Sequence, residues 1–208
     1  LGYYDESLTL CTSVAENSHR CDAIQNNIAG IYLKQKQFDK SIAGYRSYID
    51  SRTEDEKFND PDFIAPLNNL ATALRQTDQT DKALEYLNSI YSSLKANGRD
   101  NDDVAATILN NIAVTQTMTG NYTQAAQNFE QALKIKESFY GTESPLLLDL
   151  CGNLAVALWA SGKRSEALPW FERSLHLGLR SVQYNFPNLT ESDQVQFYAQ
   201  QKENFERF

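Results

Sequence analysis

One short pattern occurs four times and decides the fold: Asn, an aliphatic residue, then Ala. The four copies are Asn27-Ile28-Ala29, Asn69-Leu70-Ala71, Asn111-Ile112-Ala113 and Asn153-Leu154-Ala155. Each copy begins 42 residues after the one before it. A constant period of this size is typical of stacked, identical supersecondary units. The sequence therefore predicts a repeat protein with a 42-residue unit.

A second pattern follows each Asn at a fixed distance and indicates a second helix in every repeat. A small residue stands fourteen positions after the Asn, and a large residue stands four positions further on. Positions i and i+4 share one helix face, so the small residue lets a neighbouring helix approach and the large one fills the space beside it. The pairs are Ser41 with Tyr45, Ala83 with Leu87, Ala125 with Phe129, and Ala167 with Phe171.

A tight turn should join the two helices of each repeat. Gly120 and Gly162 stand at the turn of the last two repeats, where a left-handed helix C-cap favours glycine. Lys36 and Asp78 occupy the equivalent positions of the first two repeats. The turns of those two repeats are therefore less clearly encoded.

The same register predicts the helix bounds. Asp60-Pro61 and Ser144-Pro145 each place an N-cap residue before a proline at the first helical position. Pro66 and Pro169 lie inside helices, where proline is expected to loosen the first turns. We predict first helices near 20–35, 61–77, 103–119 and 145–161, and second helices near 38–52, 80–96, 122–139 and 164–180.

The predicted fold class is all-α: a right-handed α-solenoid of stacked antiparallel helix pairs with a C-terminal capping helix. Residues 1–19 match half a repeat, the second helix only, and residues 20–180 form four repeats of period 42. Residues 181–208 are a linker and a C-terminal helix near 191–207 that closes the open end of the array. Because the chain starts at Leu1 inside a half repeat, we expect a fragment of a longer array.

These patterns resemble the tetratricopeptide repeat family over residues 1–180. The stretch from Gly120 to Leu133 is close to the family's pattern throughout, although the usual repeat has 34 residues. The longer unit, with Ala-Leu-Lys-Ile-Lys-Glu-Ser-Phe-Tyr-Gly-Thr-Glu-Ser-Pro at 132–145, looks like the repeats of kinesin light chains. Thr80 and Arg164 depart from the aromatic residue found at Phe38 and Tyr122.

The tail carries a second resemblance. Residues 185–193 and 204–208 are similar to the segment that joins such repeats to a CHAT domain, a caspase-like protease domain found in bacteria. This resemblance implies the regulatory arm of a protease. The alternative is a free-standing adaptor that joins two proteins, as kinesin light chains do, and self-association through exposed ends is a third hypothesis.

The repeated asparagines are the candidate binding residues, because first helices line the concave surface that such arrays use. One amide per repeat can hold the main chain of an extended peptide, and the family resemblance implies the same role. In the alternative interpretation each Asn bonds within the array and ties adjacent helices. The candidates are Asn27, Asn69, Asn111 and Asn153, with Asn26, Asn68 and Asn110 preceding three of them.

Specificity should come from the next turn of the same helices. Lys34 and Arg75 make the first two repeats basic, whereas Met118 and Trp159 make the last two apolar. We therefore predict a partner with acidic character and a hydrophobic anchor, for which Trp159 is a candidate hot spot. In the alternative, the C-terminal helix folds back and covers Trp159.

Composition limits the remaining classes of function. The net charge is −8, which argues against a nucleic-acid partner and fits a basic or neutral protein. The sequence has no run of 18 apolar residues, so no membrane-spanning helix is expected, and no secretion leader is visible. Three cysteines, Cys11, Cys21 and Cys151, form no disulfide framework, so we expect core positions in a reducing, cytoplasmic compartment.

No catalytic or cofactor motif is present. His19 and His176 have no Cys or carboxylate cluster at metal-ligand spacing, and there is no Gly-rich phosphate loop. Cys151, inside a repeat helix beside Gly152, suits packing better than nucleophilic chemistry. The sequence predicts a binding protein with no enzyme activity of its own, no cofactor and no metal.

Overall fold

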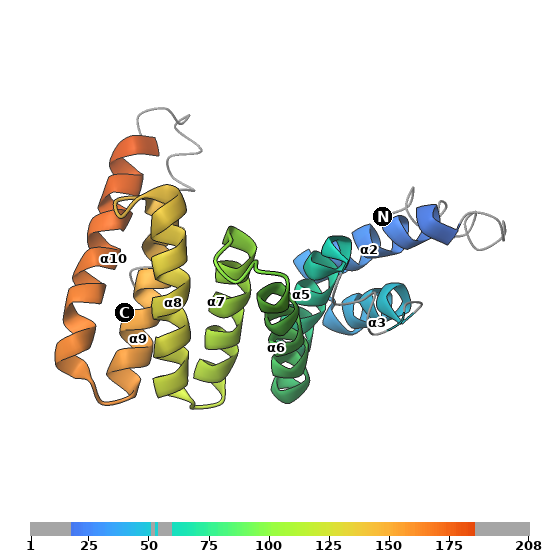
Figure 1. Ribbon diagram of the computed structural model, residues 1–208, viewed down its shortest axis with the longest axis horizontal. Helices are drawn as coiled ribbons and strands as arrows, with labels where there is room; N and C mark the ends of the chain where they lie inside the picture. Colours follow the sequence, from blue (N-terminus) through green and yellow to red (C-terminus); the bar gives the residue numbers. More distant parts are fainter. Residues whose placement is uncertain (1–17, 51–52, 54–59, 186–208) are drawn as a thin grey trace. The chain divides into compact units, whose positions relative to one another are not determined.

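The regular structure of the protein is helical throughout the part that the computed structural model describes, which is residues 18–50, 53 and 60–185 (Figure 1). The chain divides into two compact halves, residues 1–100 and 101–208. Each half holds two helix pairs of the predicted kind. The predicted half repeat before residue 18 and the predicted helix near 191–207 lie outside the described residues.

The N-terminal half contains repeats 1 and 2. Its helices are α2 (Ser18–Lys34), α3 (Phe38–Ile49), α5 (Pro61–Arg75) and α6 (Thr80–Ala96). Helix α3 packs against both α2 and α5, α5 packs against α6, and α2 also contacts α5. The two first helices, α2 and α5, therefore lie next to each other.

The C-terminal half contains repeats 3 and 4. Its elements are α7 (Asp103–Met118), α8 (Tyr122–Tyr140), the 3-10 helix η1 (Pro145–Leu147), α9 (Leu148–Ala160) and α10 (Arg164–Asn185). Helix α8 packs between α7 and α9, and α9 packs against α10, so α8, α9 and α10 run alongside one another (Figure 1). The predicted all-α class of antiparallel helix pairs is confirmed. The predicted bounds hold within three residues, except that α10 continues beyond 180 to Asn185.

The core is built from the two sequence patterns. In every repeat the two residues after the repeated Asn are buried, and so is the small residue of the second helix. The hydroxyl of Ser41 on α3 donates to the carbonyl of Ala29 on α2 at 2.9 Å, which requires close helix approach. The large partner residue is buried in three repeats, and Phe171 in the fourth is half-buried. The fully buried small residues are Ser41, Ala83, Ala125 and Ala167.

The turn inside each repeat has the same conformation in all four. Gly120 and Gly162 have φ of 78° and 88°, and Lys36 and Asp78 have φ of 58°. In each case the next residue's N–H donates to the carbonyl five residues earlier, at 2.8 to 3.0 Å. This is the long bond of a Schellman C-cap. The turns at Lys36 and Asp78, which the sequence encodes less clearly, therefore adopt the same left-handed conformation as the two glycine turns.

Two helix starts follow the predicted capping, with one difference. The carboxylate of Asp60 accepts the N–H of Asp62 at 2.9 Å, and α5 begins at Pro61. Ser144 accepts the N–H of Leu146 at 3.4 Å, but Pro145 opens a 3-10 turn and α9 begins only at Leu148. Helices α5 and α10 continue past Pro66 and Pro169. Each of these prolines is the sixth residue, so each removes only one bond of the first turn.

Replacing Lys36 with glycine should stabilise the protein. A left-handed conformation costs a residue with a side chain about 1–2 kcal/mol, whereas glycine adopts it without strain but loses more backbone entropy on folding. We expect the unfolding free energy to rise by about 0.5–1 kcal/mol, measured by urea denaturation of the whole chain. Gly162→Ala is the matched reverse change and should lower the unfolding free energy. No atom lies within 4 Å of the added Cβ, so the loss would come from backbone strain and not from a clash. A loss of stability in Lys36→Gly would contradict the strain argument.

Candidate functional site

The repeated asparagines lie at the edge of the buried face of each first helix. Asn27 on α2 is exposed, and the equivalent residues on α5, α7 and α9 are half-buried. The residues one position earlier, Asn26, Asn68 and Asn110, are also half-buried. Because the next two residues face the core, each Asn amide stands where its helix meets solvent. The half-buried equivalents of Asn27 are Asn69, Asn111 and Asn153.

A pocket in the N-terminal half brings several predicted residues together. Its volume is about 210 Å³, and its walls come from α2, α3 and α5. Four of its residues were predicted as binding residues from the sequence: Asn26, Asn27, Lys34 and Asn69. Asn68 and Arg75, also predicted, do not line this pocket. The described residues that line it are Asn26, Asn27, Gly30, Ile31, Lys34, Tyr45 and Asn69.

Gly30, Ile31 and Tyr45 line the pocket but were not predicted as binding residues, and of these three it is Tyr45 that has a polar side chain. Its position in the pattern predicts a core residue, and the side chain is 0% exposed. Tyr45 nevertheless lines the pocket, and its hydroxyl lies close to Gly30, where an added Cβ would be 3.3 Å from the hydroxyl oxygen. Burial raises the pKa of Tyr45, and the nearby Asn69 side chain offsets part of that rise. The sequence signal was available: a tyrosine on the second helix faces a glycine on the first.

The pocket is rich in hydrogen-bond donors and carries positive charge. Among the described residues of its lining, Lys34, the last residue of α2, is the charged one, and none of them carries a carboxylate. The amides of Asn26, Asn27 and Asn69 add two N–H donors each, although amides also accept. Arg75, the last residue of α5, is half-buried, and burial lowers the pKa of its guanidinium. The two cations from which the sequence predicts a preference for acidic partners lie at the ends of α2 and α5.

The predicted apolar residues of the C-terminal half are exposed. Met118 at the end of α7 is 53% exposed and Trp159 on α9 is 45% exposed. The Arg164 guanidinium lies 5.1 Å from the Trp159 ring centroid, and the Phe171 ring packs against Trp159 edge-on at 6.4 Å. These contacts hold the indole in place while leaving much of it open. Asn111 of the third repeat also has an interaction within the protein.

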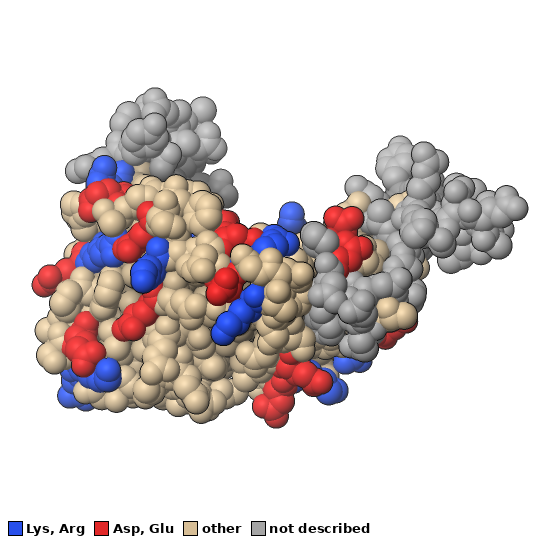
Figure 2. Space-filling view, in the orientation of Figure 1, with Lys and Arg blue, Asp and Glu red and all other residues tan. Residues whose placement is uncertain are grey.

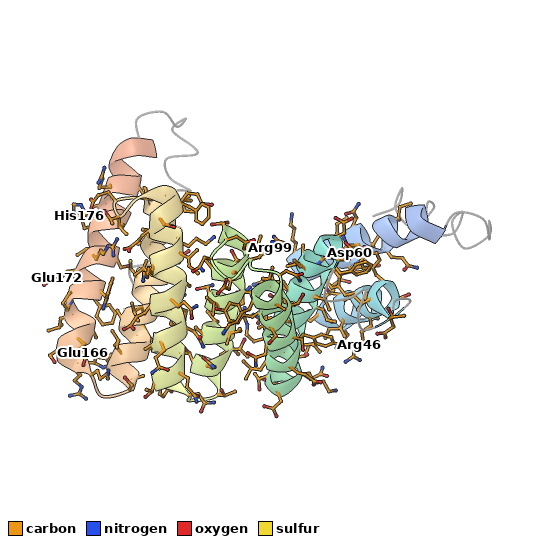
Figure 3. The ribbon with its side chains drawn as sticks, viewed as in Figure 1. Arg46, Asp60, Arg99, Glu166, Glu172 and His176 are labelled. Carbon is orange, nitrogen blue, oxygen red and sulfur yellow. The ribbon has the colours of Figure 1, made fainter. Side chains whose placement is uncertain are left out.

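Two charged or titratable side chains of α10 contact Glu143, which lies in the loop after α8. Arg180 contacts Glu143 at 2.6 Å, and His176 lies 3.3 Å from the same carboxylate. Arg180 foremost, with His176, holds the pKa of Glu143 below its ordinary value. Figure 2 shows basic and acidic side chains interspersed over this face of the C-terminal half, and Figure 3 shows His176 on α10. Within the described residues no three His, Cys, Asp or Glu side chains form a group suited to a metal ion.

The consecutive packed helix pairs define an all-α helical repeat protein. The sequence profile of the tetratricopeptide repeat family matches residues 62–138 and 104–177. The chain therefore belongs to the tetratricopeptide repeat family, whose members generally act as scaffolds for protein–protein interaction. None of the described helices is both long and apolar enough to cross a lipid bilayer.

Solved structures share the fold at low sequence identity. BtubC (BKLC) from P. vanneervenii is 19% identical with a TM-score of 0.75, over 88% of this chain and 72% of that chain. A Podosopora anserina protein described as a kinesin light chain with nearly identical TPR-like repeats is 18% identical with a TM-score of 0.69, over 94% and 100%. MamA is 14% identical with a TM-score of 0.65, over 88% and 93%. No curated protein sequence matches the chain.

Cys151 should be inert toward thiol reagents in the folded protein. The residue is fully buried on α9, and desolvation raises the pKa of its thiol to about 11. The reactive thiolate is therefore scarce at pH 8. In a Cys11→Ser, Cys21→Ser variant, we expect negligible alkylation by iodoacetamide until urea unfolds the chain. Rapid labelling of the folded protein at pH 8 would instead indicate an accessible, activated thiol.

Proposed function

We propose that this chain is an interaction scaffold that binds an extended segment of a partner protein through the asparagines of its first helices. The observation that carries the proposal is the pocket in the N-terminal half. Asn27 and Asn69 come from consecutive repeats and line it together, beside the Lys34 cation. Two equivalent amides on one surface can each donate to and accept from a peptide main chain, whatever its side chains.

The preference of the scaffold follows from the residues around those amides. Lys34 and Arg75 favour acidic side chains near the N-terminal half, since opposite charges steer partners and suppress wrong ones. Exposed Met118 and Trp159 offer an apolar anchor on the C-terminal half. Trp159 is suited to anchoring because Arg164 and Phe171 restrict its motion before a partner binds, which lowers the entropy cost of binding.

Between the two wider roles, we propose the free-standing adaptor. The similarity to the kinesin-light-chain-type repeat structure, over 94% of this chain, is compatible with that role. The role as regulatory arm of a CHAT-type protease depends on residues 185–208, of which only Asn185 is described. The role as regulatory arm of a protease therefore stays a prediction. A caspase-like His–Cys pair encoded after Phe208 would favour the protease arm over the adaptor.

The double variant Asn27→Ala, Asn69→Ala should lose peptide binding. Extended peptides would be selected by display on the wild-type chain and measured by fluorescence anisotropy. Each lost amide contact costs about 1 kcal/mol, so we expect affinity to fall about tenfold to thirtyfold. Asn88→Ala, an exposed asparagine on α6, is the matched control. Unchanged affinity together with a lower melting temperature would favour the alternative in which the amides tie helices together.

Arg75→Glu and Trp159→Ala test the predicted preference with the same peptides. Charge reversal at Arg75 should weaken acidic peptides selectively and reduce the salt dependence of their binding. Removing the Trp159 indole should cost about 2 kcal/mol or more, which is roughly thirtyfold in affinity. Leu168→Ala, a 54% exposed leucine on α10, controls for general loss of apolar surface. If neither variant changes binding, the predicted acidic and apolar preference is wrong.

A further inference from the structure

Helix α10 carries an apolar ridge at the edge of the C-terminal half. Leu175 and Leu179 are 48% and 51% exposed, and Phe171 is half-buried. The three residues follow one another in steps of four, so they form one ridge along the helix surface, called here the α10 ridge. Figure 1 shows α10 at the end of this half, with α8 and α9 on its inner side. The ridge is therefore open to a neighbour beyond the described helices.

The equivalent residues one repeat earlier show what such a ridge packs against. Phe129 and Leu133 of α8 stand 42 residues before Phe171 and Leu175, and they are 1% and 2% exposed. They are buried because α8 packs between α7 and α9, the first helix of the next repeat. Among the described elements α10 has no such following helix. The α10 ridge is thus a helix-packing surface without its second helix.

Leu179 extends the ridge beyond the contact that the other repeats use. The equivalent positions of the first three repeats are all polar, and Glu137 on α8 forms an ion pair with Arg173. A leucine at this position lengthens the apolar ridge by about one helical turn. What covers Leu179 therefore differs from the first helix of an ordinary repeat. The polar equivalents of Leu179 are Thr53, Lys95 and Glu137.

We propose that the α10 ridge is a self-association surface, on which α10 of a second copy of this chain packs antiparallel about a two-fold axis at Leu175. Leu175 then faces Leu175 of the other copy, and Phe171 faces Leu179 of the other copy on both sides of the axis. Ridges at steps of four that interdigitate are the commonest form of helix packing. The inference is independent of peptide binding. It gives a surface to the self-association that the sequence left as a third hypothesis.

Charge favours a second copy on this helix over any other contact between copies. The whole chain has a net charge of −8, so two copies repel each other in general. Helix α10 instead holds three arginines and two glutamates, which leaves one net positive charge when His176 is neutral. Glu172 and His176 lie at the outer edge of α10 (Figure 3), so polar groups are available at the rim of an apolar contact. Repulsion between copies is therefore weak where α10 meets α10.

The first test is sedimentation velocity of the whole chain over a micromolar concentration series. We expect a monomer–dimer equilibrium that follows mass action. Leu175→Glu should weaken the dimer about a hundredfold or more, because it places two carboxylates face to face at the axis. Leu146→Glu, at a 71% exposed leucine of η1 in the same half, is the matched control and should dimerise as the unchanged chain does. Both substitutions are at exposed positions, so helical circular dichroism should be unchanged.

The second test locates the axis by cross-linking. Leu175→Cys in a Cys11→Ser, Cys21→Ser background brings two thiols together if the axis lies at Leu175. Oxidation by diamide should then join two copies through a disulfide, seen as a dimer on non-reducing gels. Leu146→Cys in the same background should stay monomeric on those gels. Cross-linking of both variants to the same extent would mean random collision, and would overturn the proposed axis.

The remaining outcomes also decide the proposal. A chain that stays monomeric at every concentration overturns it. If such a monomer loses thermal stability in Leu175→Glu, the ridge is covered from within the same chain by residues outside the described ranges. A dimer that is indifferent to Leu175→Glu forms through another surface and overturns it as well. Peptide binding through Asn27 and Asn69 is measured on dilute protein, so the scaffold proposal stands or falls separately.

Discussion

The structure depends on close approach between the helices of each pair. A helix of twelve to twenty-two residues with one apolar stripe gains little stability alone and must bury that stripe against a neighbour. The small residue on each second helix, from Ser41 to Ala167, is 0% exposed in all four repeats, which shows how near the helices come. In the first repeat the approach is close enough for the Ser41 hydroxyl to bond the Ala29 carbonyl of the facing helix.

This constraint also orients the asparagines. The two residues after each repeated Asn are buried, so the Asn itself turns toward the edge of the core, one helical step away. The turn conformation maintains the same register in every repeat, whether the residue with positive φ is glycine, lysine or aspartate. Packing therefore outweighs local preference at Lys36 and Asp78. The amides occupy equivalent places because the core, and not the amides, sets the helix rotation.

A constant core leaves the exposed positions free to differ. The position six residues after the repeated Asn holds Leu33, Arg75, Thr117 and Trp159 in turn, on helices of the same kind. Such variation on a regular frame is how repeat proteins acquire different binding surfaces without changing fold. The combination of Gly30 and Tyr45 is a variation of another sort. There the core position itself has changed, and the buried hydroxyl of Tyr45 on the second helix lies close to Gly30 on the first.

The sequence alone determined the class of fold, the 42-residue register and most helix ends. It did so because the Asn-x-Ala pattern and the small-to-large pairs record periodic burial that holds in every copy. It also predicted Asn27, Asn69 and Lys34 as binding residues and Trp159 as a candidate hot spot from their register positions, and these stay predictions. Tertiary structure decided what local patterns cannot encode. The pocket exists because α2, α3 and α5 meet, and Tyr45 lines it beside Gly30 of a different helix. The first turn of the fourth repeat is 3-10 helical, and Lys36 accepts a left-handed conformation that its own preference opposes. These features depend on neighbours distant in sequence, whose combined packing free energy exceeds the local preference of any one residue.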